Sequence, residues 1–307
     1  MQGSPLANGA ETQADTDWTS IDWRQAERQV RNLRQRIFRA TQREDWKTVH
    51  SLQKLMLRSY ANRKISVRRV TQVNKGRNTP GVDKLVLKTP AARGRMVDAL
   101  GNYSIWQAQP TRRVYIPKAS GKLRPLGMPV IIDRCLQMMV KNALEPSWEA
   151  RFEGCSYGFR PGRGGHDAIE KIYRLARPRG RKKWVLDADI RGAFDNISHE
   201  YLLEVIGPIP ARELVKQWLR AGYVDQGTFH PTEAGTPQGG VISPLLANIA
   251  LHGMETALGV KHRRGQIVSL RALVRYADDV RHFTRHEIHL TEMGGSEEHS
   301  LQVTSLT

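Results

Sequence analysis

The sequence predicts an α+β fold, in which helices and strands alternate irregularly along the chain. Three observations carry this prediction. Apolar residues recur at helical spacing between residues 21 and 70. Two later stretches, 184–190 and 267–275, are rich in strand-forming residues, and carboxylates lie at or just beyond the end of each. Helical patterns return between them, near 198–206 and 211–221.

The composition favours a polyanionic partner. The 307 residues include 48 Lys and Arg against 30 Asp and Glu, a formal net charge of +18. Nucleic acid is the first expectation and an acidic membrane surface the second. Cys135 and Cys155 fit no zinc spacing and no disulfide framework, so a reduced compartment is expected. No apolar run reaches the roughly 18 residues of a membrane span, so we expect no membrane-spanning segment and, with nucleic acid favoured, no membrane partner.

The N-terminal part divides by charge. Residues 1–19 are polar and acidic, without Lys or Arg, and are predicted to be a disordered tail. Residues 20–80 are predicted to be a basic helical extension, whose first helix has apolar positions at Ala26, Val30, Leu33 and Ile37. Its basic faces are either solvated surfaces of ordinary helices or a surface that grips RNA, and the excess of arginine favours RNA.

A basic β-hairpin is predicted after a loop rich in breaking residues at 75–83. Residues 112–118 alternate like a strand, Ser120 and Gly121 make a turn, and residues 123–129 return. The hairpin carries four basic side chains, Arg113, Lys118, Lys122 and Arg124. Taken alone, these are ordinary charges on an exposed hairpin.

Three helix boundaries can be predicted from capping residues and prolines. Asp133 is expected to cap a helix that ends at Pro146. Further along, a Pro-Gln-Gly-Gly run at 237–240 precedes an apolar helix, and Pro244 fits that helix's first turn. Alone, this run is only a turn.

The two predicted acidic strands would bring carboxylates together. Side by side, they place Asp189 against Asp278 and Asp279. Three carboxylates at one point repel one another unless a hard cation lies between them, and Mg²⁺ prefers such oxygen ligands. Polymerases and nucleases use two such ions about 3.5–4 Å apart for phosphoryl transfer. An isolated Asp-Asp pair, by contrast, would merely solvate a hairpin turn.

A basic hairpin, an acidic strand, a Pro-Gln-Gly-Gly loop and an acidic turn, in this order, resemble a reverse transcriptase. More narrowly, the sequence resembles the protein encoded by group II introns of bacteria and organelles. Each motif is weakly specific, but the ordered set is strongly so, and it covers about 70–280. The matching stretches are 113–118, 124–127, 156–160, 187–190, 194–197, 235–240 and 276–279.

The resemblance implies a right-hand polymerase with fingers and palm over 81–280. Its activity would be RNA-directed DNA synthesis, in which a dNTP is joined to a primer 3′-hydroxyl on an RNA template. Asp189 and Asp278 would hold two Mg²⁺ ions, with Asp279 beside them and the Ile190 carbonyl touching a metal. Asp187 would have a supporting role.

The resemblance also implies a nucleotide site. Lys118 and Arg124 would clamp the triphosphate. Phe194 would lie under the sugar and exclude a 2′-hydroxyl, although its spacing equally suits a core Phe. Gln238 would contact the nucleotide, and Gly239 would let the backbone approach it closely.

The resemblance also implies roles for two further residues, and it implies the partners and the cellular location. Arg160 would meet template or nucleotide phosphate, and His199 would be structural. The implied partners are group II intron RNA, an RNA template with a DNA primer, and dNTPs. The expected location is the cytoplasm of a bacterium, with an organelle as the alternative.

The resemblance fails after Asp279. Residues 280–286 are too polar for the apolar strand that family members have there, and 281–307 are predicted to be a divergent, unstructured polar tail without a thumb. We therefore expect a truncated enzyme that is weak or inactive alone. A non-catalytic, maturase-like protein that binds intron RNA is the alternative. A two-metal nuclease is a third reading, against which Gln238 and the Lys118–Arg124 clamp argue.

Overall fold

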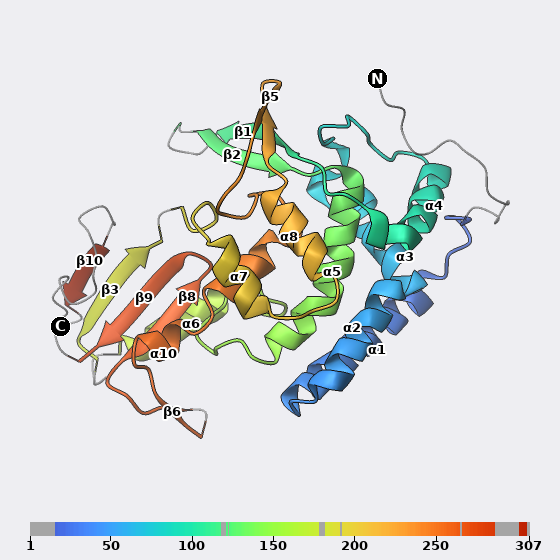
Figure 1. The fold of residues 1–307 in the computed structure, drawn as a ribbon. Helices are drawn as coiled ribbons and strands as arrows, with labels where there is room; N and C mark the ends of the chain where they lie inside the picture. Colours follow the sequence, from blue (N-terminus) through green and yellow to red (C-terminus); the bar gives the residue numbers. More distant parts are fainter. Residues whose placement is uncertain are drawn as a thin grey trace.

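The computed structural model describes residues 16–117, 121, 123–177, 182–190, 192–264, 266–285 and 301–305. It confirms the α+β class: helices form the N-terminal part, and two separate four-stranded sheets follow (Figure 1). Most of the predicted acidic tail, residues 1–15, lies outside the described residues, and so do Lys118 and Lys122. Trp18, within the same predicted tail, is buried and packs edge-on against Trp23.

The N-terminal helices begin at side-chain caps, which satisfy backbone N–H groups that have no partner within the helix. Asp22 accepts a hydrogen bond from the Gln25 N–H, and Asp45 and Ser59 cap the next two helices in the same way. The elements of this part are α1 (Trp23–Gln42), α2 (Trp46–Arg58), α3 (Tyr60–Arg68), a π-helical turn Arg69–Val73, a 3-10 turn Lys75–Asn78, α4 (Pro90–Ala99) and a 3-10 segment Leu100–Ile105.

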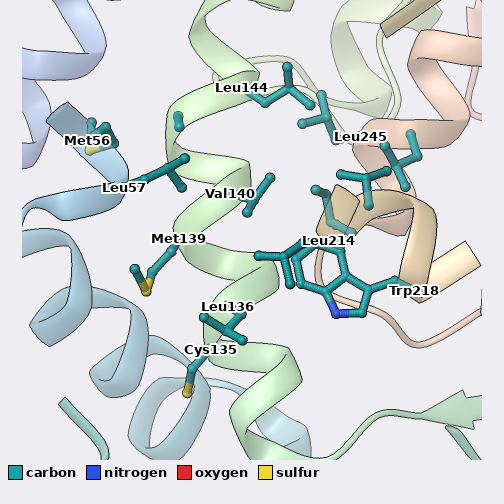
Figure 2. Close-up of a cluster of buried hydrophobic side chains, with 14 of the residues drawn as sticks. Met56, Leu57, Cys135, Leu136, Met139, Val140, Leu144, Leu214, Trp218 and Leu245 are labelled. Atoms are coloured by element: carbon teal, nitrogen blue, oxygen red, sulfur yellow. The ribbon is translucent and has the colours of Figure 1, made fainter. Parts of the chain in front are cut away.

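Helix α5 (Ile131–Glu149) is the centre of the fold and is buried along almost its whole length. Figure 2 shows its apolar side chains between two layers. Met56 and Leu57 of α2 lie on one side, and Leu214, Trp218 and Leu245 lie on the other. The helix therefore joins the N-terminal helices to α8 (Arg212–Arg220) and α9 (Ser243–Ala250), and α7 (His199–Ile206) packs against both of these.

Both predicted boundaries of this helix are wrong. The helix runs past Pro146 to Glu149, because a proline this close to the end removes only one late hydrogen bond. Asp133 is not a cap. It is fully buried, and its carboxylate accepts hydrogen bonds from the indole N–H groups of Trp106 (2.8 Å) and Trp218 (2.9 Å). Burial raises the pKa of Asp133 despite these donors.

The first sheet contains the predicted basic hairpin. Strands β1 (Thr111–Pro117) and β2 (Leu123–Met128) pair antiparallel, as the alternation of residues predicts. The strand order is β2-β1-β4-β5, with β4 (Tyr223–Asp225) parallel to β1 and β5 (Thr228–His230) antiparallel to β4.

The second sheet contains both predicted acidic strands. Its order is β10-β3-β9-β8, and all of its pairs are antiparallel. The strands are β3 (Trp184–Asp189), β8 (Ala272–Tyr276), β9 (Asp279–Thr284) and β10 (Leu301–Ser305). Helix α6 (Gly165–Leu175) packs against β8. The remaining elements are α10 (Met254–Ala257), β6 (His262–Arg263) and β7 (Gln266–Ile267).

The prediction that no strand follows Asp279 is wrong. Residues 279–284 form β9, which is the central partner of both β3 and β8. Val280 and Phe283 are buried. Each of the two polar residues between them fits the strand for a different reason. Arg281 forms a salt bridge with Asp187 across the strands (3.1 Å), and burial of His282 lowers its pKa to about 4, which keeps it neutral. Part of the predicted unstructured tail, residues 301–305, is likewise a strand.

Two predictions from composition can be compared with the structure. Cys135 and Cys155 are both buried free thiols. Among the described residues, no helix combines the length and the apolar character needed to cross a bilayer.

Candidate active site

The acidic turn is a tight hairpin between β8 and β9. Tyr276 pairs with Asp279, so the turn consists of Ala277 and Asp278 alone. Ala277 has φ = +58°, in the left-handed region that costs a residue with a Cβ roughly 1–2 kcal/mol. Such a conformation persists where its surroundings hold it in place.

Arg275 is the main residue that holds this turn. Its side chain is fully buried and donates from Nη1 to the Ala277 carbonyl oxygen (3.0 Å) and to Asn248 Oδ1 (2.9 Å). Nη2 donates to Ser156 Oγ (2.9 Å). Burial lowers the pKa of this guanidinium. The turn is thus fastened to α9 and to the segment around Ser156.

The backbone of the same segment extends the sheet beyond β8. The Arg275 N–H donates to the Cys155 carbonyl (2.8 Å), and the Tyr157 N–H donates to the Arg275 carbonyl (2.9 Å). Gly158 follows directly, and a Cβ built on it would lie 2.3 Å from the Ala277 nitrogen. Only glycine fits this close approach, so the Ser-Tyr-Gly-Phe-Arg motif packs directly against the backbone of the acidic turn.

The structure brings the three predicted carboxylates together. Asp189 lies opposite Asp279 in the β3–β9 register, and the Ile190 N–H donates to the Asp278 carbonyl (3.2 Å). The pKa of Asp279 is raised, first by burial and then by the negative charges of Asp278 and Asp189. This repulsion is the electrostatic condition that a bound cation would relieve.

The donor chemistry at this point fits a hard cation. The three carboxylates supply oxygen ligands, which Mg²⁺ prefers, whereas the Ile190 carbonyl accepts a hydrogen bond from the Ala193 N–H (3.2 Å). No group of three or more His, Cys, Asp or Glu side chains in the described part of the chain already has the arrangement of metal ligands. Asp187 is engaged elsewhere, because it forms the salt bridge with Arg281 on the same sheet face.

The Pro-Gln-Gly-Gly loop connects the two sheets. The Gln238 carbonyl accepts a hydrogen bond from the Gly127 N–H on β2 (2.7 Å), and Gln238 Oε1 accepts one from Arg124 Nε (2.9 Å). Gln238 Nε2 donates to Asp195 Oδ2 (3.4 Å). The predicted nucleotide residues Gln238 and Arg124 therefore contact each other, and Gln238 also reaches the segment that follows β3.

The other predicted residues of the nucleotide site lie around this loop. Phe194 is buried, and its carbonyl accepts from the Thr236 N–H (2.7 Å). Gly239 has φ = +120°, and a Cβ there would lie 2.6 Å from the Gly127 carbonyl oxygen. Lys118 lies outside the described residues.

A cavity of about 450 Å³ opens beside this junction. Arg113 and Tyr223 line it from the first sheet, and Asp195 and Gln238 line it from the loops that follow β3 and precede α9. The Arg113 guanidinium stacks on the Tyr223 ring at 3.7 Å, which fixes the wall formed by the first sheet.

Arg160 and His199 are both buried and form hydrogen bonds within the protein. Arg160 is buried and donates to the Glu149 carboxylate and to the Ser156 carbonyl, so the prediction that it meets a phosphate is wrong. His199 is also buried, with Nε2 at 2.7 Å from the Gly235 carbonyl, in keeping with a structural residue.

Sequence reasoning missed Arg275 and Gly158. Both lie inside or next to motifs that it used, but their roles depend on contacts between segments far apart in the chain. The one available signal was the position of an arginine within an otherwise apolar strand directly before the acidic turn.

Two family models match the chain. A model described as the N-terminal domain of reverse transcriptase matches residues 18–100. A model described as reverse transcriptase (RNA-dependent DNA polymerase) matches residues 116–300, which is more than half of the 307 residues. The expected fingers and palm are thereby confirmed as the fold.

The chain is also similar to curated proteins that are longer than the matched part. Protein YkfC of Escherichia coli (strain K12) is 38% identical over 213 residues, which are 64% of this chain and 55% of that protein. The group II intron-encoded protein LtrA of Lactococcus lactis subsp. cremoris is 43% identical over 152 residues, which are 48% of this chain and 25% of that protein. The chain thus spans about half of one relative and a quarter of the other.

Among solved structures, a partial Cas6-RT-Cas1–Cas2 complex matches with a TM-score of 0.45 and 22% identity, over 77% of this chain and 39% of that one. The family models, which match 18–100 and 116–300, show the family. The chain belongs to the reverse transcriptase family of RNA-dependent DNA polymerases, with group II intron-encoded proteins among its relatives.

Proposed function

We propose that this chain is the polymerase part of a group II intron-encoded protein and that it joins dNTPs to a primer 3′-hydroxyl on an RNA template. The observation that carries the proposal is the convergence of Asp189, Asp278 and Asp279 at one sheet end. Family membership gives the reaction class, and reverse transcriptases use divalent metal ions.

The roles of the acidic residues follow from oxygen chemistry. Asp189 and Asp278 would hold two Mg²⁺ ions, with Asp279 and the Ile190 carbonyl as neighbouring oxygen donors. Bound there, the ions would lower the pKa of the primer hydroxyl and neutralise charge on the triphosphate. Asp187 would keep β9 aligned on β3 through Arg281.

The roles of the nucleotide residues follow from the junction at Gln238. Arg124, already fixed by its hydrogen bond to Gln238, would donate to the triphosphate, and Lys118 would add a point charge. Phe194 would lie under the sugar and exclude a 2′-hydroxyl. Gly239 would allow the backbone to approach the nucleotide.

We propose the domain division that the sequence predicts, with an extension over 20–80 and fingers and palm over 81–280. Group II intron RNA, an RNA template with its DNA primer, and dNTPs are the proposed partners. A bacterial cytoplasm is the proposed location, with an organelle as the alternative.

Primer extension tests the function. The chain is incubated with an RNA template, a DNA primer, dNTPs and Mg²⁺, beside Asp189→Asn and a matched Glu170→Gln variant on the exposed face of α6. Asp189→Asn should abolish synthesis, and Glu170→Gln should retain it. Synthesis that persists in Asp189→Asn would show that the activity does not come from this site.

A maturase-like RNA-binding protein is the second candidate, favoured by the basic N-terminal helices and by relatives named maturase-like proteins. Salt-dependent binding of intron RNA separates the two. Under this second function, Asp189→Asn leaves RNA binding and splicing assistance intact while the wild-type chain makes no DNA. The contact between Arg124 and Gln238, which we assign to the triphosphate, argues against a nuclease.

A further inference from the structure

Phe159 combines backbone strain with an exposed aromatic ring. Its φ is +62°, and its side chain is 48% exposed. A bulky residue is disfavoured in the left-handed region, and a ring that is about half exposed offsets that cost only in part. Strain of this kind, retained beside a site, points to a use for the side chain.

The neighbours of Phe159 fix its backbone. On one side, Gly158 lies against the Ala277 nitrogen, and its carbonyl accepts a hydrogen bond from Asn248 Nδ2 (2.8 Å). On the other side, the buried Arg160 side chain is held by Glu149 and by the Ser156 carbonyl. Because both flanking residues are immobilised, the direction in which the Phe159 ring points is set by the fold.

The ring points at Phe194. The two ring centroids are 6.0 Å apart and the planes meet at 76°, an edge-to-face contact. Phe159 also borders a groove of about 580 Å³ together with Gly239, Gly240 and Val241. Phe159 therefore contacts Phe194 and also lines the same groove as the loop proposed to approach the nucleotide.

We propose that Phe159 is a positioning residue for sugar selection, which holds the Phe194 ring where it excludes a 2′-hydroxyl. This inference rests on the proposed polymerase function. Phe194 is otherwise packed in the main hydrophobic core, so the Phe159 ring adds a further contact that limits its movement. In a hydrophobic pocket, a change as small as one methylene alters discrimination roughly 10–200-fold, so a small displacement of the Phe194 ring is enough for a measurable effect.

The test is the ratio of kcat/KM for a dNTP to that for the matching rNTP, measured by primer extension on an RNA template. Phe159→Gly removes the ring and accepts the left-handed backbone without strain. It should lower the ratio about tenfold, mainly by making rNTPs better substrates. Phe159→Tyr keeps the ring edge and should keep the ratio. Phe229→Ala removes an aromatic ring of similar exposure from β5 and should leave the ratio unchanged.

A second comparison separates positioning from simple stability. In a Phe194→Val background, removing Phe159 should change the ratio no further, because no ring remains to be positioned. If Phe159→Gly lowers dNTP and rNTP use equally, the residue is structural only and the inference fails. If Phe159→Gly does not fold, Phe159→Asn replaces it, because Asn also tolerates the left-handed region. The same change in the dNTP to rNTP ratio is then expected.

The two proposals fail in different ways. A wild-type chain that discriminates against rNTPs, with an unchanged ratio in Phe159→Gly, overturns the role of Phe159 and leaves the polymerase function standing. A wild-type chain without any template-dependent synthesis overturns the polymerase function for this chain, and the role of Phe159 falls with it.

Discussion

Arg275 donates a hydrogen bond to the carbonyl oxygen of Ala277, two residues further along the chain (3.0 Å). Through this bond a buried guanidinium stabilises the left-handed residue of the acidic turn. The same side chain reaches Asn248 and Ser156, so the position of Asp278 depends on two segments distant in sequence. The sheet and the buried contacts of Arg275 thereby hold the carboxylates in place. A catalytic site requires such support from surrounding residues.

Replacing Arg275 should therefore affect stability and activity together. Arg275→Ala leaves three buried acceptors without their donor and should reduce the free energy of unfolding by roughly 3 kcal/mol. Arg275→Lys keeps the charge but cannot reach three acceptors in one plane, so we expect an intermediate loss. Urea unfolding measures the first effect and primer extension the second. Arg263→Lys on the exposed strand β6 is the control. An equal loss of stability and synthesis in that variant would show that the buried contacts of Arg275 are not the cause.

A substitution at Gly158 tests directly whether the packing against the acidic turn matters for activity. In Gly158→Ala the new Cβ would lie 2.3 Å from the Ala277 nitrogen, so the acidic turn or the 155–160 segment has to move. We expect DNA synthesis to fall at least tenfold, because a displacement of about 1 Å is enough to weaken catalysis by two orders of magnitude.

Gly154→Ala is the matched control for this experiment. A Cβ on Gly154 would meet nothing within 4 Å, although the residue lies in the same segment. Both variants should be folded by circular dichroism. Equal synthesis by the two variants would mean that the close approach of Gly158 does not position the carboxylates.

The sequence predicted the parts of the site that depend on local pattern. Alternation of residues predicted β1 and β2, and runs of strand-forming residues predicted β3 and β8. The acidic ends of β3 and β8 predicted that Asp189 would meet Asp278 and Asp279. These predictions succeeded because strand alternation and turn chemistry are set by residues close together in the chain.

The failures have a common physical cause, which is tertiary contact. Strand β9 was missed because His282 and Arg281 are polar, yet burial keeps His282 neutral and Asp187 pairs with Arg281 across the sheet. Asp133 looked like a cap, but two tryptophans from other segments bind its carboxylate inside the core. Nothing within a few residues of either position carries this information.

Gln238 should influence nucleotide binding through Arg124. In Gln238→Ala the Arg124 Nε loses its acceptor, so the guanidinium is no longer fixed before the triphosphate arrives. We expect KM for dNTP to rise roughly tenfold, with a smaller change in kcat. Steady-state primer extension gives both constants, and a double variant with Arg124→Ala should add little to either single variant. Full additivity would show that the two residues act independently.

His282 makes the stability of the sheet depend on pH. Burial, aided by the positive charge of Arg271, lowers the pKa of His282 from 6.5 to about 4. The unfolded chain therefore takes up a proton that the folded chain does not. The stabilisation is fully present above pH 6.5 and is lost as the pH falls from 6.5 towards 4, by roughly 3 kcal/mol in all. The pKa of His252 is also lowered by burial and acts in the same direction, so the effect has to be assigned with a variant.

His282→Leu is that variant. Neither ring nitrogen of His282 has a hydrogen-bond partner among the described residues, so an apolar side chain in β9 removes two buried unpaired polar atoms along with the titration. Thermal unfolding between pH 4 and 7 should show a shallower loss of Tm below pH 6.5 in His282→Leu than in the wild type, and a higher Tm at pH 5. His166→Gln at the start of α6 should follow the wild-type profile. Parallel profiles for wild type and His282→Leu would assign the acid sensitivity to other groups, with His252→Leu the next variant to measure.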